Sequence, residues 1–331
     1  MNSFLKNIIL FCIPILLLTY PLDTYISSQL KQSNDNYGEF EVWNDIYEGQ
    51  INTDIAIYGS SRSWVHIDPL ILKDSLNLSA YNFGVNGHTF PIQYLRHLEY
   101  LKFNKKPKHI IVSVDIFTLV KRDQLYNLEQ FLPYMLFNKN IYLYTNKYQG
   151  FTFLDYYTPL SRYIGKKNTI VNAINISLKE DSIKHYRING YKGIEKNWNN
   201  DFDKTKKELN EITIEIDQQT SNLFQTFLNE CHNNNINVTL VATPEFIEGQ
   251  HFVSNRESVI DTYKDFAKNQ NLVFLDYSTD SICFNKAYFY NALHLNKSGA
   301  ELFTRKLAHD LKKRIFKYLT HNGKNNTNTS N

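Results

Sequence analysis

Cysteine, glycine and proline are scarce in this chain of 331 residues, with counts of three, 12 and eight. Three scattered cysteines cannot build a disulfide framework, and because Cys12 lies in an apolar leader, the one conceivable bridge joins Cys231 to Cys283. A formal net charge of +3 creates no demand for a polyanionic partner. We therefore expect an ordinary folded chain that does not bind nucleic acid.

Two kinds of cofactor motif are also missing from the sequence. Aspartate and histidine residues do not cluster at the spacing of metal ligands, and no Cys-x-x-Cys pair suggests zinc. No glycine-rich phosphate loop occurs either. The sequence therefore predicts neither a metal site nor a bound cofactor.

One long apolar run is present, near the start of the chain. Residues 8–18 (IILFCIPILLL) suit the core of a signal peptide, since a membrane-spanning helix needs about 20 apolar residues. No Ala-x-Ala-like cleavage site follows, however, and Tyr20 could extend the segment into the interface, with Lys6 on the near side. We predict an uncleaved anchor over residues 1–26 with the rest exported; a cleaved signal peptide and a buried helix of a soluble protein are the alternatives.

Residues 27–50 are polar with scattered aromatics, which indicates a juxtamembrane connector. Beyond it, short apolar runs alternate with amphipathic stretches, the pattern of a parallel sheet covered on both faces. The predicted strands are 54–58, 79–82, 109–114, 237–242 and 272–276. The predicted helices are 91–103, 221–233, 257–269 and 298–318, with a further helix that Asp68 caps and Pro69 begins.

The alternation is lost over residues 119–220, which are rich in Tyr, Phe, Asn and Lys. We interpret this stretch as an insertion or cap over the carboxyl edge of the sheet, where it would influence substrate choice. The polar tail, residues 320–331, should be disordered. The folded domain is thus expected over residues 51–319.

Three short motifs could supply chemistry. GSSRS (59–63) follows the first strand, where a serine needs a base within hydrogen-bond reach to become a nucleophile. YNFGVNGHT (81–89) follows the second strand, and its glycines could donate backbone N–H groups to an oxyanion. In YFYNALHLNKSGAELF (288–303), His294 precedes the last helix. Turns of small residues explain the first two motifs equally well, whereas the position of His294 on a loop ahead of a helix favours an exposed histidine over a packed one.

In this order and at these places, the motifs resemble those of the SGNH (GDSL-like) hydrolase superfamily over residues 54–115 and 238–319. The resemblance implies a three-layer, flavodoxin-like α/β fold with a mainly parallel five-stranded sheet. It implies that Ser61 is the nucleophile and His294 its base. The oxyanion would be bound by the N–H groups of Ser61 and Gly87.

Two positions depart from the family pattern. Asn291 stands where the family has the aspartate that orients the histidine, so the protein would be a slow enzyme, an inactivated version of an active parent, or a non-catalytic relative. Asp115 stands where the family has an asparagine that donates to the oxyanion, which an ionised carboxylate cannot do. We hypothesise that Arg62 pairs with Asp115; otherwise Arg62 is a solvated surface charge. His88 is a further candidate supporting residue.

One branch of this superfamily is most similar to this chain in three sequence segments and in the expected N-terminal anchor. The segments are YGSSRSW, VDIF and HLNKSGAELF. The members of this branch are membrane-tethered proteins of envelope polymer acylation, including polysaccharide O-acetylation and D-alanyl-lipoteichoic acid biosynthesis. The resemblance implies a single-pass protein of the bacterial inner or plasma membrane with an extracytoplasmic or periplasmic domain. That domain would be a serine esterase or O-acyltransferase on acyl esters of an envelope polysaccharide, working through acyl-Ser61.

Two further expectations follow from the resemblance. A membrane-bound O-acyltransferase would be a partner that hands acyl groups across the membrane. Alternatively, the chain is a catalytically degenerate subunit that binds or scaffolds polysaccharide in an acylation complex.

Overall fold

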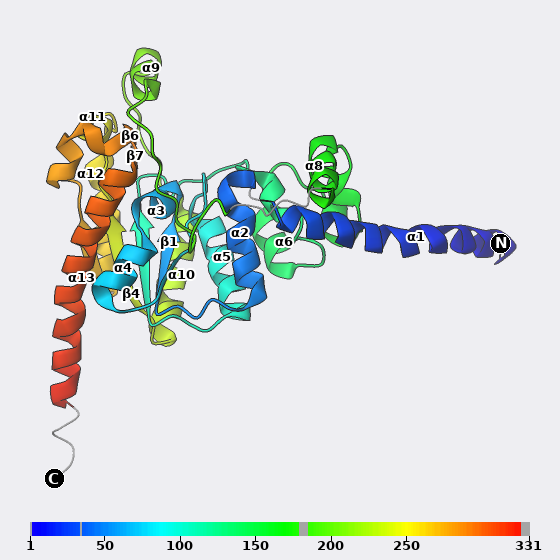
Figure 1. Ribbon diagram of the computed structural model, residues 1–331, viewed down its shortest axis with the longest axis horizontal. Helices are drawn as coiled ribbons and strands as arrows, with labels where there is room; N and C mark the ends of the chain where they lie inside the picture. The colour runs from blue at the N-terminus through cyan, green and yellow to red at the C-terminus, as the bar shows by residue number, and fades with distance from the viewer. Residues whose placement is uncertain (1, 34, 179–184, 326–331) are drawn as a thin grey trace, which may run out of the picture. The chain divides into compact units, whose positions relative to one another are not determined.

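The computed structural model describes residues 2–33, 35–178 and 185–325 (Figure 1). The chain forms two compact units. The first comprises residues 1–50, 94–103 and 122–187, and the second comprises residues 51–93, 104–121 and 188–331. Each unit is therefore built from segments that are distant in the sequence.

A five-stranded parallel sheet of order β2-β1-β3-β4-β5 forms the centre of the second unit. Its strands are β1 (Ile55–Gly59), β2 (Ala80–Asn82), β3 (His109–Val114), β4 (Asn237–Ala242) and β5 (Val273–Asp276). The expected α/β class and five-stranded sheet are confirmed, and each strand lies within one residue of its predicted bounds at either end. Because the strand order reverses between β1 and β3, their carboxyl ends form a topological switch point, where ligands of such sheets bind.

Alternate residues of each strand pack against different helices, as the period of two in a strand requires. On one face, Ile57 of β1 and Val241 of β4 share a core with Leu72 of α4 (Pro69–Leu76) and with α13 (Lys297–Asn325). On the other face, Tyr58 packs against Phe227 of α10 (Gln218–Asn233). Helices α10 and α12 (Arg256–Asn269) also contact β4 on this side.

Short elements complete the second unit near the carboxyl ends of the strands. They are α3 (Ser61–His66), α9 (Asp201–Glu208), α11 (Ile247–His251), η3 (Ser281–Phe284), η4 (Lys286–Tyr288), β6 (Phe289–Asn291) and β7 (His294–Leu295). As predicted, Asp68 caps α4, whose first residue is Pro69. Helix α13 extends through residues 320–325, where the sequence predicted a disordered tail; the remainder of that tail lies outside the described residues.

The first unit is helical. It contains α1 (Asn2–Lys31), α2 (Asp35–Glu48), the later part of α5 (Phe90–Phe103), η1 (Leu128–Phe131), α6 (Lys139–Thr145), α7 (Phe153–Tyr157), η2 (Ser161–Tyr163) and α8 (Lys167–Ser177). Helix α1 is long and apolar enough to span a membrane or to serve as a signal sequence. The connector predicted over residues 27–50 instead includes α2, whose Phe40, Trp43 and Ile46 are buried. Aromatic residues that looked scattered in the sequence thus form a core.

The predicted insertion, residues 119–220, is divided between the two units. Residues 122–187 belong to the first unit, and residues 188–220 belong to the second together with the sheet. A stretch that reads as one insertion in the sequence therefore contributes to two separate cores.

Candidate active site

The turn after β1 presents Ser61 at the carboxyl edge of the sheet. Gly59 ends β1 at a φ of +150°, and a Cβ there would lie 2.8 Å from the carbonyl oxygen of Ser113 on β3. Ser60 caps α3, and its Oγ donates a hydrogen bond of 2.5 Å to Oδ2 of Asp115. Ser61 is thereby held as the first residue of α3, partly accessible to solvent.

Three of the predicted site residues form one hydrogen-bonded chain. Ser61 Oγ lies 2.8 Å from His294 Nε2, and His294 Nδ1 lies 3.0 Å from Asn291 Oδ1. Residues 61 and 294 are distant in the sequence and meet because β7 and α3 are packed together. The geometry is that of a nucleophile, a base and a residue that orients the base.

The backbone around Asn291 determines the tautomer of His294. Asn291 Oδ1 also accepts hydrogen bonds from the backbone N–H groups of Leu293 at 3.0 Å and His294 at 2.9 Å. An atom that faces two N–H donors is the amide oxygen, so the proton of the imidazole lies on Nδ1. Nε2 is then free to accept the proton of the Ser61 hydroxyl.

The surroundings of His294 disfavour its protonated form. Burial lowers the pKa of His294 most, and the positive charge of Arg62 lowers it further, while Asp115 acts in the opposite direction. The neutral amide of Asn291 adds no compensating charge. The imidazole is therefore a neutral acceptor at physiological pH, and an imidazolium formed during a reaction would be weakly stabilised.

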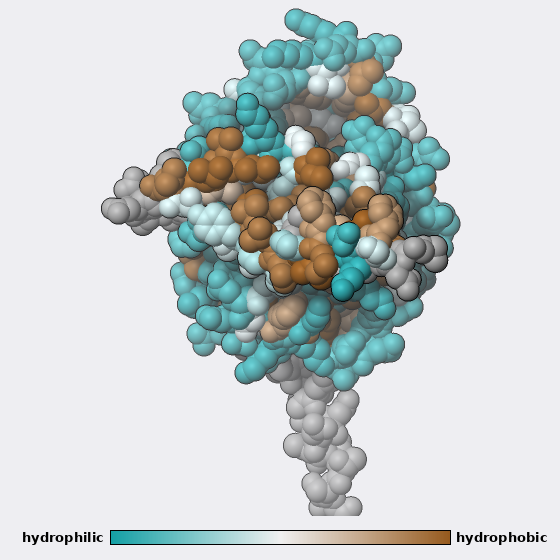
Figure 2. Space-filling view, turned by 90° about the vertical axis from the view of Figure 1, so that its right-hand side faces the viewer, coloured by the Kyte–Doolittle hydropathy of each residue, from teal (hydrophilic) through white to brown (hydrophobic). Residues whose placement is uncertain are grey.

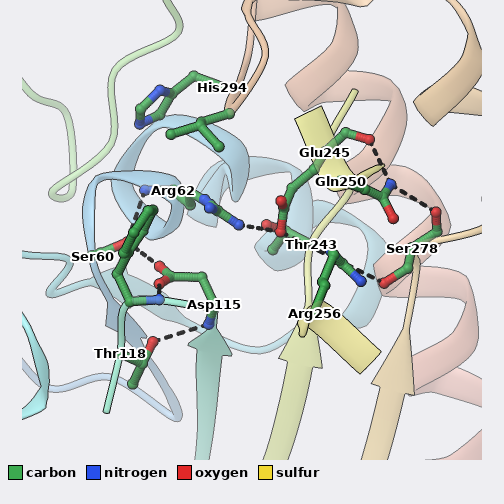
Figure 3. Close-up of polar contacts among 12 residues, drawn as sticks. Ser60, Arg62, Asp115, Thr118, Thr243, Glu245, Gln250, Arg256, Ser278 and His294 are labelled. Atoms are coloured by element: carbon green, nitrogen blue, oxygen red, sulfur yellow. Dashed lines mark hydrogen bonds and ion pairs between the residues drawn. The ribbon is translucent and has the colours of Figure 1, made fainter. Parts of the chain in front are cut away.

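Arg62 does not pair with Asp115, contrary to our hypothesis, and it is not a solvated surface charge either. Its buried guanidinium forms an ion pair with Glu245, which follows β4 (Figure 3). Arg256 of α12 reaches the same carboxylate oxygen at 3.2 Å and donates to Ser278 Oγ at 3.1 Å. Glu245 is shared by the two guanidinium groups, and no motif in the sequence singled it out.

The carboxylate of Asp115 binds the turn that carries the nucleophile. Its two carboxylate oxygens accept from Ser60 Oγ and, at 2.7 Å, from the N–H of Phe117 (Figure 3). A carboxylate that accepts on both oxygens has nothing to donate to an oxyanion. The doubtful oxyanion role of Asp115 is therefore replaced by a role in positioning Ser60.

The glycine motif after β2 holds α3 in place. Gly84 donates its N–H to Asn82 Oδ1 at 3.0 Å, and a Cβ on Gly84 would lie 2.8 Å from the backbone nitrogen of Trp64. The buried amide of Asn82 also donates to the carbonyl oxygens of Ser63 at 2.8 Å and Ile67 at 2.9 Å. The close approach that Gly84 permits is thus to the backbone of α3 and not to a ligand.

Gly87 and His88 follow in the same motif. Gly87 lies in a turn with a φ of +70°, a conformation that favours glycine. His88 is buried, and its carbonyl oxygen accepts from Gln93 Nε2 at 3.2 Å. Both residues follow β2, the strand that pairs with β1. The role of Gly87 in binding the oxyanion and that of His88 as a supporting residue of the site stay predictions.

A second histidine, His66, supports the loop that carries the base. It is fully buried at the end of α3, and its Nε2 accepts the N–H of Leu295 at 3.0 Å while Nδ1 lies 3.0 Å from Thr243 Oγ1. Burial, with the charges of His294 and Arg62, holds the pKa of His66 well below its usual value. No sequence motif pointed to this role of His66, because its partners Thr243 and Leu295 come from distant segments.

A strap formed by residues 188–199 runs beside the site. Its Gly190 adopts a φ of +76° against β2, where a Cβ would overlap the carbonyl oxygen of Asn82 at 1.7 Å. The strap also bonds to α3, through Lys192 N and Trp64 O at 3.1 Å, and to β6, through Asn199 N and Tyr290 O at 2.9 Å. The ring of Tyr290 stacks on His294 with centroids 5.3 Å apart.

The cysteines and the possible metal ligands do not form a second site in the described residues. Cys12, Cys231 and Cys283 are free, so the conceivable bridge is not formed. Within residues 2–33, 35–178 and 185–325, no three His, Cys, Asp or Glu side chains gather at a possible metal site.

No protein-family model matches the sequence, and no curated protein matches it. Solved structures with a similar arrangement include a GDSL-like lipase from Bacteroides thetaiotaomicron, at 10% identity over 84% of this chain and 100% of that one, with a TM-score of 0.34. A protein assigned to the lipolytic G-D-S-L family from Desulfitobacterium hafniense shares 13% identity over 78% of this chain and 99% of its own, with a TM-score of 0.37.

Proposed function

We propose that this protein is a serine esterase or acyltransferase that forms an acyl ester on Ser61. The observation that carries the proposal is the chain from Ser61 Oγ through both nitrogens of His294 to Asn291 Oδ1. Ser61 Oγ attacks the carbonyl carbon of an ester and passes its proton to His294 Nε2. His294 then protonates the departing alcohol as the ester C–O bond breaks.

The second half of the reaction releases the acyl group. Water, or a sugar hydroxyl in a transferase, gives its proton to His294 Nε2 and attacks the acyl carbon, and the proton then returns to Ser61 Oγ. In both halves, the N–H groups of Ser61 and Gly87 are proposed to bind the oxyanion. The uncharged Asn291 makes both halves slow, because the imidazolium lacks a carboxylate partner.

The proposed substrate is an acylated polysaccharide of the cell envelope. Helix α1 supports placement of the protein at a membrane, with its body on the outer side as the position of Lys6 indicates. An O-acyltransferase in the same membrane is the proposed source of acyl groups. A polysaccharide-binding subunit without activity is the second candidate, favoured by the loss of a carboxylate at Asn291.

Labelling with a fluorophosphonate tests the enzymatic proposal. In the wild-type protein, Ser61 Oγ should displace fluoride from the phosphorus atom of the probe and form a phosphonate ester. Ser61→Ala should abolish labelling and His294→Ala should slow it strongly, while Ser258→Ala, at an exposed serine on α12, should leave it unchanged. A folded wild-type protein that resists labelling would overturn the esterase proposal and favour the binding subunit.

A further inference from the structure

Helix α1 changes character at Asp23. The side chains ahead of it are largely exposed, including those of Phe4, Phe11 and Leu18 at 70%, 73% and 72%. From there one helical stripe is buried, formed by Asp23, Ile26, Ser27 and Leu30. The exposed part, residues 3–22, would extend for about 30 Å, which is the thickness of the hydrocarbon core of a bilayer.

Polar bonds fix the buried part of α1 to the first unit. Asp23 forms a buried ion pair with Arg162 at 2.6 Å and accepts the N–H of Leu160 at 2.7 Å. Ser27 Oγ lies 2.8 Å from the hydroxyl of Tyr163. The segment around η2 therefore lies at the level where α1 leaves the folded unit.

Apolar side chains are exposed at this same level. Ile164 directly follows Tyr163 and is 79% exposed. Helix α8 packs along α1, yet its apolar residues Val171, Ile174 and Leu178 are exposed, while Thr169 and Ala173 are buried. A surface helix of a globular protein normally turns its apolar side chains toward the core, whereas these three are exposed, and Ile170 and Ile176 are only half-buried.

Helix α7 adds Phe153 and Leu154, which are 63% and 58% exposed. We call the six residues Phe153, Leu154, Ile164, Val171, Ile174 and Leu178 the apolar collar. Figure 2 views the molecule from the side toward which α1 points, and the apolar residues near the middle of this view include those of α1 itself. Contiguous exposed apolar surface on a folded protein marks a binding surface.

We propose that the apolar collar binds the lipid interface of the membrane in which α1 is anchored. The occupant is lipid because the collar lies where the exposed apolar part of α1 begins, so both surfaces meet the same medium. Lys167 is exposed on the same side of α8 as Val171 and Ile174, where its ammonium group can reach lipid phosphates. The first unit thus rests on the bilayer, an inference that depends on the proposed membrane placement of α1.

Depth-dependent quenching tests this proposal on the full-length protein in nanodiscs of phosphatidylglycerol and phosphatidylethanolamine. An environment-sensitive fluorophore is attached to Cys12, which is exposed on α1, while Cys231 and Cys283 are buried. In a Cys12→Ser background, the label is moved to Ile174→Cys, Phe153→Cys or Gln32→Cys. Gln32 follows α1 about 13 Å beyond Asp23 and serves as the matched control.

Lipids that carry a spin-label quencher near the headgroup should quench the labels at positions 174 and 153 at least threefold more than the label at position 32. Quenchers placed deep in the acyl chains should act on the label at Cys12. If Cys12 is quenched while positions 153 and 174 stay in water, the collar proposal is overturned and the anchor stands. An unquenched Cys12 would overturn both the anchor and the collar.

Discussion

The amide oxygen of Asn291 lies 3.0 Å from Nδ1 of His294 and accepts two backbone N–H groups at the same time. An aspartate at this position would orient the imidazole in the same way and would also stabilise its positive charge. The structure therefore separates two tasks that one carboxylate usually performs. Orientation of His294 is retained, and charge stabilisation is absent.

Restoring the carboxylate should accelerate the reaction. In serine proteases the opposite change, aspartate to asparagine, lowers turnover by about ten-thousand-fold. We expect Asn291→Asp to raise the rate of fluorophosphonate labelling and the kcat for short-chain p-nitrophenyl esters by at least about tenfold. Asn291→Ala, which removes the acceptor, should lower both. Equal rates for all three proteins would show that residue 291 does not act on His294.

The pH dependence should report the low pKa of His294. Because the base acts only when unprotonated, kcat/KM falls where His294 gains its proton, and its lowered pKa places this acid limb below the ordinary histidine value of 6.5. The Asn291→Asp variant adds a negative charge, which raises the pKa of His294 and moves the limb to higher pH. Rate profiles of both proteins from pH 4 to 9, measured with one ester, check the direction. A limb at or above 6.5 in the wild-type protein would contradict the assigned environment.

The buried pair of Arg62 and Glu245 should be required for stability. Glu245→Ala leaves the guanidinium of Arg62 buried without its main partner, a change that typically costs about 3–5 kcal/mol. Arg62→Met combined with Glu245→Leu removes both charges of this pair, and it should recover part of the loss, because Arg256 then keeps only its bond to Ser278. Urea unfolding of the single and double variants gives the free energies of unfolding. A double variant as unstable as Glu245→Ala would show that the charge itself is not the cause.

His66 should act as a positioning residue for the base. Its Nε2 accepts the N–H of Leu295, the residue after His294, so His66→Leu leaves that N–H unpaired and frees the loop. We expect kcat to fall about tenfold or more, since small displacements of a catalytic group are costly. His66→Gln, which offers an oxygen in a similar place, should recover part of the rate with KM unchanged. Loss of stability with an unaltered kcat in both variants would mean a purely structural role.

The fold was predictable because its signals are local. The strands β1, β3 and β4 are short apolar runs with sharp ends, and the motif around His294 precedes a helix, so their order along the chain indicated the topology. The pairing of Ser61 with His294 was implied by the resemblance of the motifs to those of the SGNH hydrolase superfamily. Glu245 and His66 could not be found in this way, because their partners lie on other strands and only folding brings them together.

The predicted ion pair between Arg62 and Asp115 was wrong, and the reason is structural. Arg62 and Asp115 both follow strands at the same edge of the sheet, which made a pair between them reasonable. The hydroxyl of Ser60 and the carboxylate of Glu245 compete for these two groups, and neither contact has a sequence signature. Similarly, the aromatic residues of α2 form a core that the polar background of residues 27–50 concealed.

The continuity of α1 through Asp23 has a mechanical consequence. One helix contains both the exposed apolar part and the stripe fixed by Arg162 and Tyr163, so the proposed anchor would be joined to the first unit without an intervening loop. If α1 is the anchor, as proposed, a rotation of this helix about its axis would rotate the first unit with it. Inserting a short glycine-rich hinge after Leu22 would uncouple the rotation of the exposed part of α1 from that of the first unit.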